Sequence, residues 1–351
     1  MIELNELLRI GVGNKASDVH IAVGRAPSFR INGHMRLIDA EPLTGEDTLQ
    51  YAKSCLDKEK FEHLMSVGEV DLSMTVPGVS RFRVNAFLQR GSVSMVFRVL
   101  SSNIPTLESL NLPDVIKQLC NIKEGLILVT GPTGSGKSTT MASIINEINS
   151  TKDGHILTLE DPIEYIFKHD RCVVNQREVG QDSKSYASAL RAALREDPDV
   201  IFIGEMRDIE SISIAVTAAE TGHLVLSTLH TLGAAKTIDR LIDVFPPHQQ
   251  QQIRVQVSSA LKAVISQRLV PDIEHKGRVA AIEIMVVTPA ISNLIREGRA
   301  AGINSCIQTG ATLGMQLLDK SIADLYEQKR ISKDDAYAYC VDKDALRRYV
   351  G

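Results

Sequence analysis

The chain has 351 residues, of which 44% are hydrophobic and 23% charged, and its formal net charge at pH 7 is −4. This length allows two domains with a buried core, and the composition is typical of a soluble protein without general attraction to nucleic acid or anionic lipid. Five scattered cysteines without a C-x-x-C pair argue against a zinc site, and the lack of a signal-peptide start or a ~20-residue apolar run predicts a cytoplasmic protein without membrane insertion.

The first hundred residues predict a small α+β domain. A helix near 4–10 and a strand near 18–23 precede Asn32-Gly33, a two-residue turn signal between two short strands. Two helices and three strand-like runs follow, at 45–55, 57–66, 70–76, 81–89 and 92–100. The segment 101–113 carries two prolines and several polar residues and is interpreted as a linker.

Residues 114–351 predict a second, larger domain. Four short runs are almost continuously apolar, as in parallel strands buried on both faces, at 125–130, 156–160, 200–204 and 224–228. Helices near 183–195 and 209–221, a further strand at 278–287 and a helical appendage from about 289 complete it. This alternation predicts an α/β fold, a mostly parallel sheet with helices on both faces. In the appendage, one apolar helical stripe predicts core packing, formed by Met315, Leu318, Ile322 and Leu325.

A complete phosphate-binding loop, Gly-Pro-Thr-Gly-Ser-Gly-Lys-Ser, occupies residues 131–138 between an apolar strand and an amphipathic helix. Its glycines allow successive backbone N–H groups to converge on phosphate oxygens, and the helix N-terminus adds a favourable dipole. Lys137 is placed to reach the β- and γ-phosphates, and the Ser138 hydroxyl to bind Mg²⁺. A plain glycine-rich turn is the weaker alternative, because every position of the motif is filled. We expect a nucleoside triphosphate to bind Thr133, Gly134, Ser135, Gly136, Lys137, Ser138 and Thr139.

Three acidic residues follow predicted core strands. Glu205 ends one strand, and an acid at the carboxyl end of a buried parallel strand lies beside the phosphate loop. Gly204 stands where many such sites carry a metal-binding Asp, so we expect Glu205 to contact Mg²⁺ through water. Glu160 and Glu164 bracket an acidic segment in which either could orient the attacking water. The alternative for this segment is a solvated acidic loop.

Two histidines and three arginines are further candidates. His223 and His230 bracket the last of the four apolar strands and could together sense the γ-phosphate, although single histidines at strand ends are often structural. Arg81, Arg83 and Arg98 lie on two adjacent predicted strands of the first domain. Guanidinium groups suit phosphate oxygens and can act from a neighbouring subunit. A solvated basic face is the alternative for the arginines.

These residues carry a family resemblance. The segments GPTGSGKSTT, TLEDPIEY, IFIGEMRD and TAAETGHLVLSTLHT resemble the Walker A, Asp-box, Walker B and His-box motifs of secretion-type motor ATPases. With its short N-terminal domain and its Gly314-Met315-Gln316 segment, the whole chain resembles the type IV pilus retraction ATPases. The resemblance implies a PAS-like domain on a RecA-like ATPase domain, assembled as a homohexamer that hydrolyses ATP with Mg²⁺.

The resemblance also implies roles and partners. Glu164 is then the water-activating carboxylate and Glu205 the residue that contacts Mg²⁺ through water. Arg83 and Arg98, with Arg81 less firmly placed, are then fingers that reach a neighbouring subunit's nucleotide. The implied function is pilus retraction and twitching motility at the inner membrane, with a PilC-like platform protein as partner and without nucleic acid.

One departure from the family bears on the subtype. Residues 290–295 read AISNLI where the retraction family carries AIRNLI, so Ser292 replaces a charged contact. The sequence therefore leaves open whether the chain is a principal or an accessory motor, or an assembly-type ATPase. A nucleic-acid-translocating ATPase is disfavoured by the absence of Trp and the negative charge. A non-catalytic regulator is disfavoured by the intact acidic residues and histidines.

Overall fold

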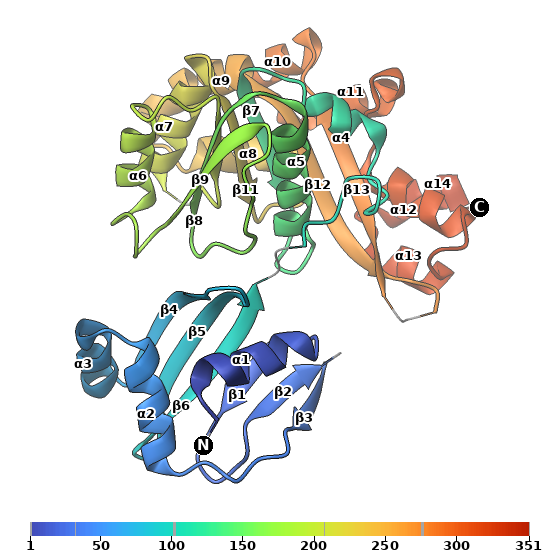
Figure 1. Cartoon of the computed structure of the whole chain (residues 1–351). Coiled ribbons are helices and arrows are strands. Elements are labelled where there is room, and N and C mark those ends of the chain that lie inside the picture. The colour runs from blue at the N-terminus through green and yellow to red at the C-terminus, as the bar shows by residue number, and fades with distance from the viewer. Residues whose placement is uncertain (1, 32, 101–102, 207, 275–276, 351) are drawn as a thin grey trace. The chain divides into compact units, whose positions relative to one another are not determined.

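The computed structural model describes residues 2–31, 33–100, 103–206, 208–274 and 277–350. The chain divides into two compact units, one running to residue 103 together with 164–166, and one containing 104–163 and the chain from 167 onward (Figure 1). Three expectations concern positions outside the described residues, namely the turn residue Asn32, the linker start Ser101–Ser102 and Arg207 of the Walker B segment.

The N-terminal unit is built on an antiparallel six-stranded sheet in the order β3-β2-β1-β6-β5-β4. Its apolar core lies between this sheet and the helices, because alternate residues of β5 and β6 point inward and are buried. Thr44 and Asp47 form a capping box that begins α2, and Asp57 caps α3. The elements are α1 (Leu4–Gly13), β1 (Asp18–Ile21), β2 (Ser28–Ile31), β3 (His34–Leu37), α2 (Gly45–Cys55), α3 (Lys58–Val67), β4 (Glu69–Val76), β5 (Ser80–Gln89) and β6 (Ser92–Leu100).

The second unit contains a seven-stranded sheet in the order β13-β12-β7-β11-β10-β8-β9 (Figure 1). All neighbouring strands are parallel except β12 and β13, which form an antiparallel pair. The central strands are entirely buried, which explains their continuous apolar sequences. The strands are β7 (Gly125–Thr130), β8 (Gly154–Glu160), β9 (Cys172–Glu178), β10 (Val200–Ile203), β11 (Leu224–Leu229), β12 (Leu261–Pro271) and β13 (Arg278–Val286).

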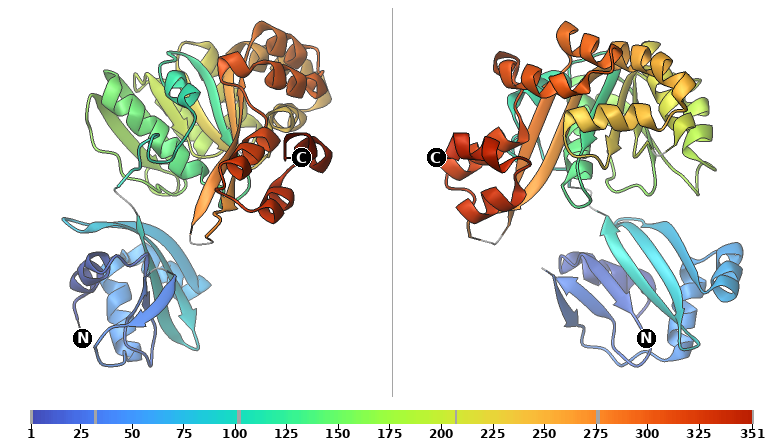
Figure 2. Two further views of the ribbon diagram at one scale, coloured as in Figure 1. Left: turned by 90° about the vertical axis from the view of Figure 1, so that its right-hand side faces the viewer. Right: turned by 180° about the vertical axis from the view of Figure 1, so that it is seen from behind.

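Helices cover both faces of this sheet, as the views in Figure 2 show. One face carries α5, which contacts β7, β9 and β11, and the other carries α6 to α9. The last helices pack at the β12–β13 end. The helices are α4 (Asp114–Leu119), α5 (Lys137–Thr151), α6 (Tyr186–Ala193), α7 (Ile209–Glu220), α8 (Ala234–Asp243), α9 (Pro247–Ala260), α10 (Pro289–Arg296), α11 (Ile303–Thr309), α12 (Leu318–Glu327), α13 (Lys333–Tyr339) and α14 (Lys343–Val350).

The predicted fold class is confirmed: a small α+β unit is followed along the chain by a mostly parallel α/β sheet. Two strands, β9 and β12, were not expected. β9 is a polar edge strand, and β12 follows α9 directly at Leu261, without a glycine or proline to mark the change. All four residues of the apolar stripe are buried as predicted, but Met315 packs in a different cluster from Leu318, Ile322 and Leu325. No helix among the described residues is both long and apolar enough to cross a bilayer.

Candidate functional site

The phosphate-binding loop connects β7 to α5 at the carboxyl edge of the sheet, as its sequence predicts. Gly131 and Gly136 have φ angles of 146° and 87°, in the range that disfavours side chains. A Cβ atom on Gly131 would lie 2.3 Å from the backbone carbonyl oxygen of Gln267 in β12. The loop therefore requires glycine at this position for space as well as for conformation.

Lys137 begins α5 and is only 8% exposed. Its Nζ donates hydrogen bonds to the carbonyl oxygens of Gly131, at 2.8 Å, and Pro132, at 3.0 Å. These contacts hold the ammonium within the curve of the loop, where phosphate oxygens would meet it. The position fits the expected role of the lysine as a phosphate ligand.

The other predicted nucleotide-binding residues surround Lys137. Thr133 and Gly134 are exposed on the loop, whereas Ser138 and Thr139 are half-buried in the first helical turn. The first N–H groups of an α-helix lack partners within the helix and are directed at a ligand beyond its end. The N–H of Ser135 differs, because it donates to the carbonyl oxygen of Pro132 at 3.2 Å. The loop and the helix start thus form a cradle suited to a triphosphate.

Glu205 and His230 come together beside this loop. They follow the parallel strands β10 and β11, so both lie at the carboxyl edge. The Nε2 atom of His230 lies 3.3 Å from Oε1 of Glu205, and its Nδ1 atom lies 3.5 Å from the Thr133 hydroxyl. A neutral imidazole satisfies both contacts by donating to Glu205 and accepting from Thr133. His230 therefore links the loop to the acid, and both line a hollow of about 330 Å³.

His223 does not belong to this group within one chain. It precedes β11, at the amino edge of the sheet, and its carbonyl oxygen accepts from the N–H of Gly125, the first residue of β7. Its Nδ1 atom lies 3.0 Å from the carbonyl oxygen of Ala218. The six residues of β11 separate it from His230, and a strand of that length extends about 20 Å. The expected action of the two histidines as a pair is therefore corrected.

Glu160 ends β8 but its side chain is turned into the protein. It is 6% exposed, and its Oε1 atom accepts hydrogen bonds from the Thr158 hydroxyl at 2.6 Å and from Nε2 of Gln176 at 3.1 Å. These donors lie on β8 and β9 and fasten the carboxylate to the sheet. A carboxylate held in this way is better suited to shaping the site than to activating water.

The segment that carries Glu164 is held by two side chains that sequence analysis missed. Glu178 is 3% exposed and accepts a hydrogen bond from the N–H of Ile163 at 3.2 Å. Gln176 accepts one from the N–H of Phe167 at 2.8 Å. Both lie on β9, an unexpected strand, and contacts that span 9 and 15 residues leave no local sequence signal. Glu164 itself lies four residues beyond the end of β8.

Gly204, which precedes Glu205, is enclosed. A Cβ atom there would lie 3.0 Å from the Tyr186 hydroxyl oxygen and 3.4 Å from Cα of Glu160. An aspartate at this position would force Tyr186 to move. This crowding is a physical reason why residue 204 is glycine and not the metal-binding aspartate that many such sites carry.

The three candidate arginines lie on β5 and β6 of the N-terminal unit. Arg83 and Arg98 are exposed and directly opposite each other on β5 and β6, and Arg81 shares their face. Asp18 on β1, opposite Arg98 on its other side, is 5% exposed. Its Oδ1 atom lies 3.0 Å from Nε of Arg98. Like charges placed opposite repel, and Asp18 offsets this repulsion.

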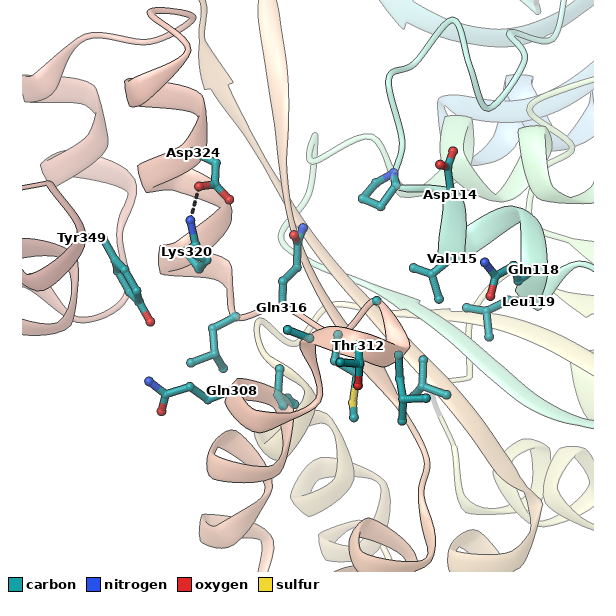
Figure 3. A pocket seen from close by; sticks show the side chains of 18 residues that line it. Asp114, Val115, Gln118, Leu119, Gln308, Thr312, Gln316, Lys320, Asp324 and Tyr349 are labelled. Carbon is teal, nitrogen blue, oxygen red and sulfur yellow. Dashed lines mark hydrogen bonds and ion pairs between the residues drawn. The ribbon is translucent and has the colours of Figure 1, made fainter.

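A separate groove of about 900 Å³ lies between α4 and the C-terminal helices (Figure 3). Asp114 and Gln118 border it from α4, and Lys320 and Asp324 from α12. Lys320 is the only cation among the described residues that line it, and it pairs with Asp324. The lining includes no residue of the phosphate loop. This groove is therefore separate from the phosphate-loop site.

Known proteins resemble this chain over almost its whole length. It matches the family described as type II/IV secretion system protein over residues 2–341. The type IV pilus retraction ATPase PilT of Pseudomonas aeruginosa is 48% identical over 335 residues, which cover 95% of this chain and 97% of that protein. A twitching motility protein of Neisseria gonorrhoeae is 47% identical over 310 residues, covering 88% of this chain and 83% of that protein.

A solved structure agrees with these sequence matches. A crystal structure of the pilus retraction motor PilT with bound ADP is similar to this chain with a TM-score of 0.92 at 49% identity. The match covers 99% of this chain and 100% of that one. The similarity therefore extends to the arrangement of the fold as well as to the motifs.

Proposed function

Since the chain belongs to the type II/IV secretion system protein family, we propose that it is an ATP-hydrolysing motor that powers retraction of a type IV pilus. The observation that carries this proposal is a complete phosphate loop, with Glu205 and His230 beside it, in a chain 48% identical to a pilus retraction ATPase. Twitching motility is the cellular output. The enzyme is an ATPase.

We propose that residues 1–100 are the PAS-like domain and 114–351 the RecA-like ATPase domain, joined by the linker 101–113. Six copies form the working ring. Arg83 and Arg98, with Arg81, then complete a neighbouring copy's site. Support comes from the exposure of Arg83 and Arg98 on one sheet face and from the ion pair that holds Arg98 to Asp18. A PilC-like platform protein at the cytoplasmic side of the inner membrane is the proposed partner.

Mg²⁺ is the proposed metal, bound by the Ser138 hydroxyl and, through water, by Glu205. The residues fit it, because a hydroxyl and a carboxylate are the oxygen ligands that Mg²⁺ prefers, and both lie at the loop. When bound, the ion neutralises charge on the phosphate oxygens. His230 holds the Glu205 carboxylate in place.

Replacing Glu205 by glutamine is expected to raise the Mg²⁺ concentration for half-maximal ATPase activity about tenfold, as loss of an outer ligand partner commonly does. The neutral amide attracts metal-bound water less strongly than the carboxylate. Titration of ATPase activity with Mg²⁺ at saturating ATP measures this shift. Glu210→Gln is the control, because Glu210 lies in the first turn of α7, is exposed and pairs with Arg191. An unchanged Mg²⁺ dependence of Glu205→Gln would contradict the assignment.

Deletion of the gene tests the cellular function. We expect excess surface pili and no twitching motility, because pili that are assembled are then not withdrawn. Surface pili are counted by electron microscopy, and motility is scored on agar. Complementation with the wild-type gene restores motility, whereas complementation with the Lys137→Ala gene does not. Loss of pili after deletion would instead indicate an assembly role.

An accessory motor is the second candidate, because of Ser292. Its hydroxyl donates to the carbonyl oxygen of Ser258 at 2.6 Å and ties α10 to α9, in place of a charged side chain. The same deletion distinguishes the two. A partial loss of motility with a normal number of pili would favour the accessory role.

A further inference from the structure

Gln267 is a buried polar residue that contacts the phosphate loop from a strand outside the nucleotide motifs. It lies on β12, next to Ser266, which pairs with Thr130 at the end of β7. Because β12 continues beyond this pair while β7 ends, Gln267 faces the loop that follows β7. Its side chain is 1% exposed.

Its contacts with the loop are close. The Gln267 Nε2 atom donates a hydrogen bond to the carbonyl oxygen of Ser135 at 2.6 Å. This orientation of the amide is required, since a carbonyl oxygen can only accept. A Cβ atom on Gly136 would lie 3.0 Å from the same Nε2 atom. Gln267 therefore packs against both ends of the loop, at Gly131 through its backbone and at Gly136 through its side chain.

The hydrogen bond to Ser135 sets the direction of a neighbouring N–H group. In a trans peptide the C=O and the N–H point in opposite directions. The peptide bond between Ser135 and Gly136 is trans, because Asp161–Pro162 is the only cis peptide bond among the described residues. When Gln267 holds the Ser135 carbonyl toward β12, the Gly136 N–H points away from β12. That N–H belongs to the group that binds phosphate oxygens in such loops.

We infer that Gln267 is a positioning residue for nucleotide binding, which turns the Ser135–Gly136 peptide so that its N–H faces the phosphate. The inference rests on the proposed function, because it concerns the same loop. Gln267 acts through the backbone and does not contact the nucleotide. It gives a role to a glutamine that is buried on β12 beyond the apolar residues Ala263, Val264 and Ile265.

Gln267→Glu tests this orientation through pH. A protonated glutamic acid can donate to the Ser135 carbonyl, whereas the carboxylate cannot and also repels phosphate. Burial raises the pKa of a carboxyl group above its ordinary value of about 4.3, so the proton is lost as pH rises through a shifted pKa. We expect affinity for MgADP close to that of the wild type near pH 6, and at least about tenfold weaker near pH 8.5.

Isothermal titration calorimetry with MgADP on the full-length protein measures these affinities, with the wild type as reference at each pH. The reference accounts for changes in the nucleotide itself. The charged groups near the loop and near Gln267 are Lys137, Arg278 and Glu283, and all three are unchanged between the wild type and the variants. Gln267→Met lacks a donor at every pH and is expected to bind MgADP about tenfold more weakly throughout. The matched control is Gln250→Glu. Gln250 lies on α9, away from the loop, and its amide also donates a hydrogen bond to a backbone carbonyl oxygen, that of Phe245.

The outcomes separate the possibilities. A pH-dependent defect in Gln267→Glu, a constant defect in Gln267→Met and normal binding by the control support the inference. Binding within twofold of the wild type by Gln267→Met would overturn it, and so would an equal defect at all pH values in Gln267→Glu. If the wild type itself fails to bind MgADP, the proposed function fails instead.

Discussion

Replacement of Lys137 by alanine is expected to lower the rate of ATP hydrolysis at least about a hundredfold, comparable to removal of one donor that stabilises a transition-state charge. The Lys137 ammonium is buried within the loop and held by two carbonyl oxygens, so it is pre-positioned for the phosphates. The substitution removes a full charge where negative charge shifts during phosphoryl transfer. Steady-state phosphate release at saturating ATP is the measurement.

The same helix offers a matched control for Lys137→Ala. Lys152 directly follows the carboxyl end of α5, and its Nζ donates to the carbonyl oxygen of Ile122 at 2.9 Å. Lys152→Ala also removes a partly buried ammonium bound to a backbone carbonyl, but at the opposite edge of the sheet. We expect its ATPase rate to stay within about twofold, as changes outside a site usually do. Full activity of Lys137→Ala would contradict the assignment of the loop.

Local sequence patterns were sufficient for the centre of the fold and for the loop. The strand β7, the glycines and the start of α5 form a continuous segment, and each has a recognisable composition. Glu205 and His230 were also predictable, because they follow apolar strands whose carboxyl ends meet at one edge. In these cases the physical cause lies within a few neighbouring residues.

Residues that act across the sheet were not predictable in the same way. Gln176, Glu178 and Gln267 lie on β9 and β12, and their partners are beyond the reach of a local sequence pattern, at 9, 15 and 132 residues along the chain. A single polar residue in a strand carries no sign of which carbonyl or N–H it will meet. His223 is the opposite case, because the sequence suggested a contact that the structure does not contain. Proximity to β11 in sequence suggested a partnership with His230, but the strand places the two at opposite edges.

Sequence reasoning also left Glu160 and Glu164 as alternatives for the residue that orients water, and the structure favours a structural role for Glu160. The carboxylate of Glu160 already accepts from Thr158 and Gln176. Both donors meet the same oxygen atom, so the amide oxygen of glutamine keeps the two contacts only as neutral hydrogen bonds, which are weaker than hydrogen bonds to a carboxylate. We therefore expect Glu160→Gln to lower the melting temperature, measured by thermal unfolding, with a smaller effect on turnover than a change of the catalytic base.

Glu164→Gln is expected to lower kcat for ATP by about 10²- to 10⁴-fold, the contribution of a general base, while MgATP affinity stays within about threefold. An amide of the same shape keeps the loop 161–167 in place, because Gln176 and Glu178 hold it through the backbone N–H groups of Phe167 and Ile163. Only the capacity to accept a proton from water is lost. Single-turnover hydrolysis together with equilibrium binding separates the two quantities. If Glu160→Gln abolished hydrolysis while Glu164→Gln kept it, the two roles would have to be exchanged.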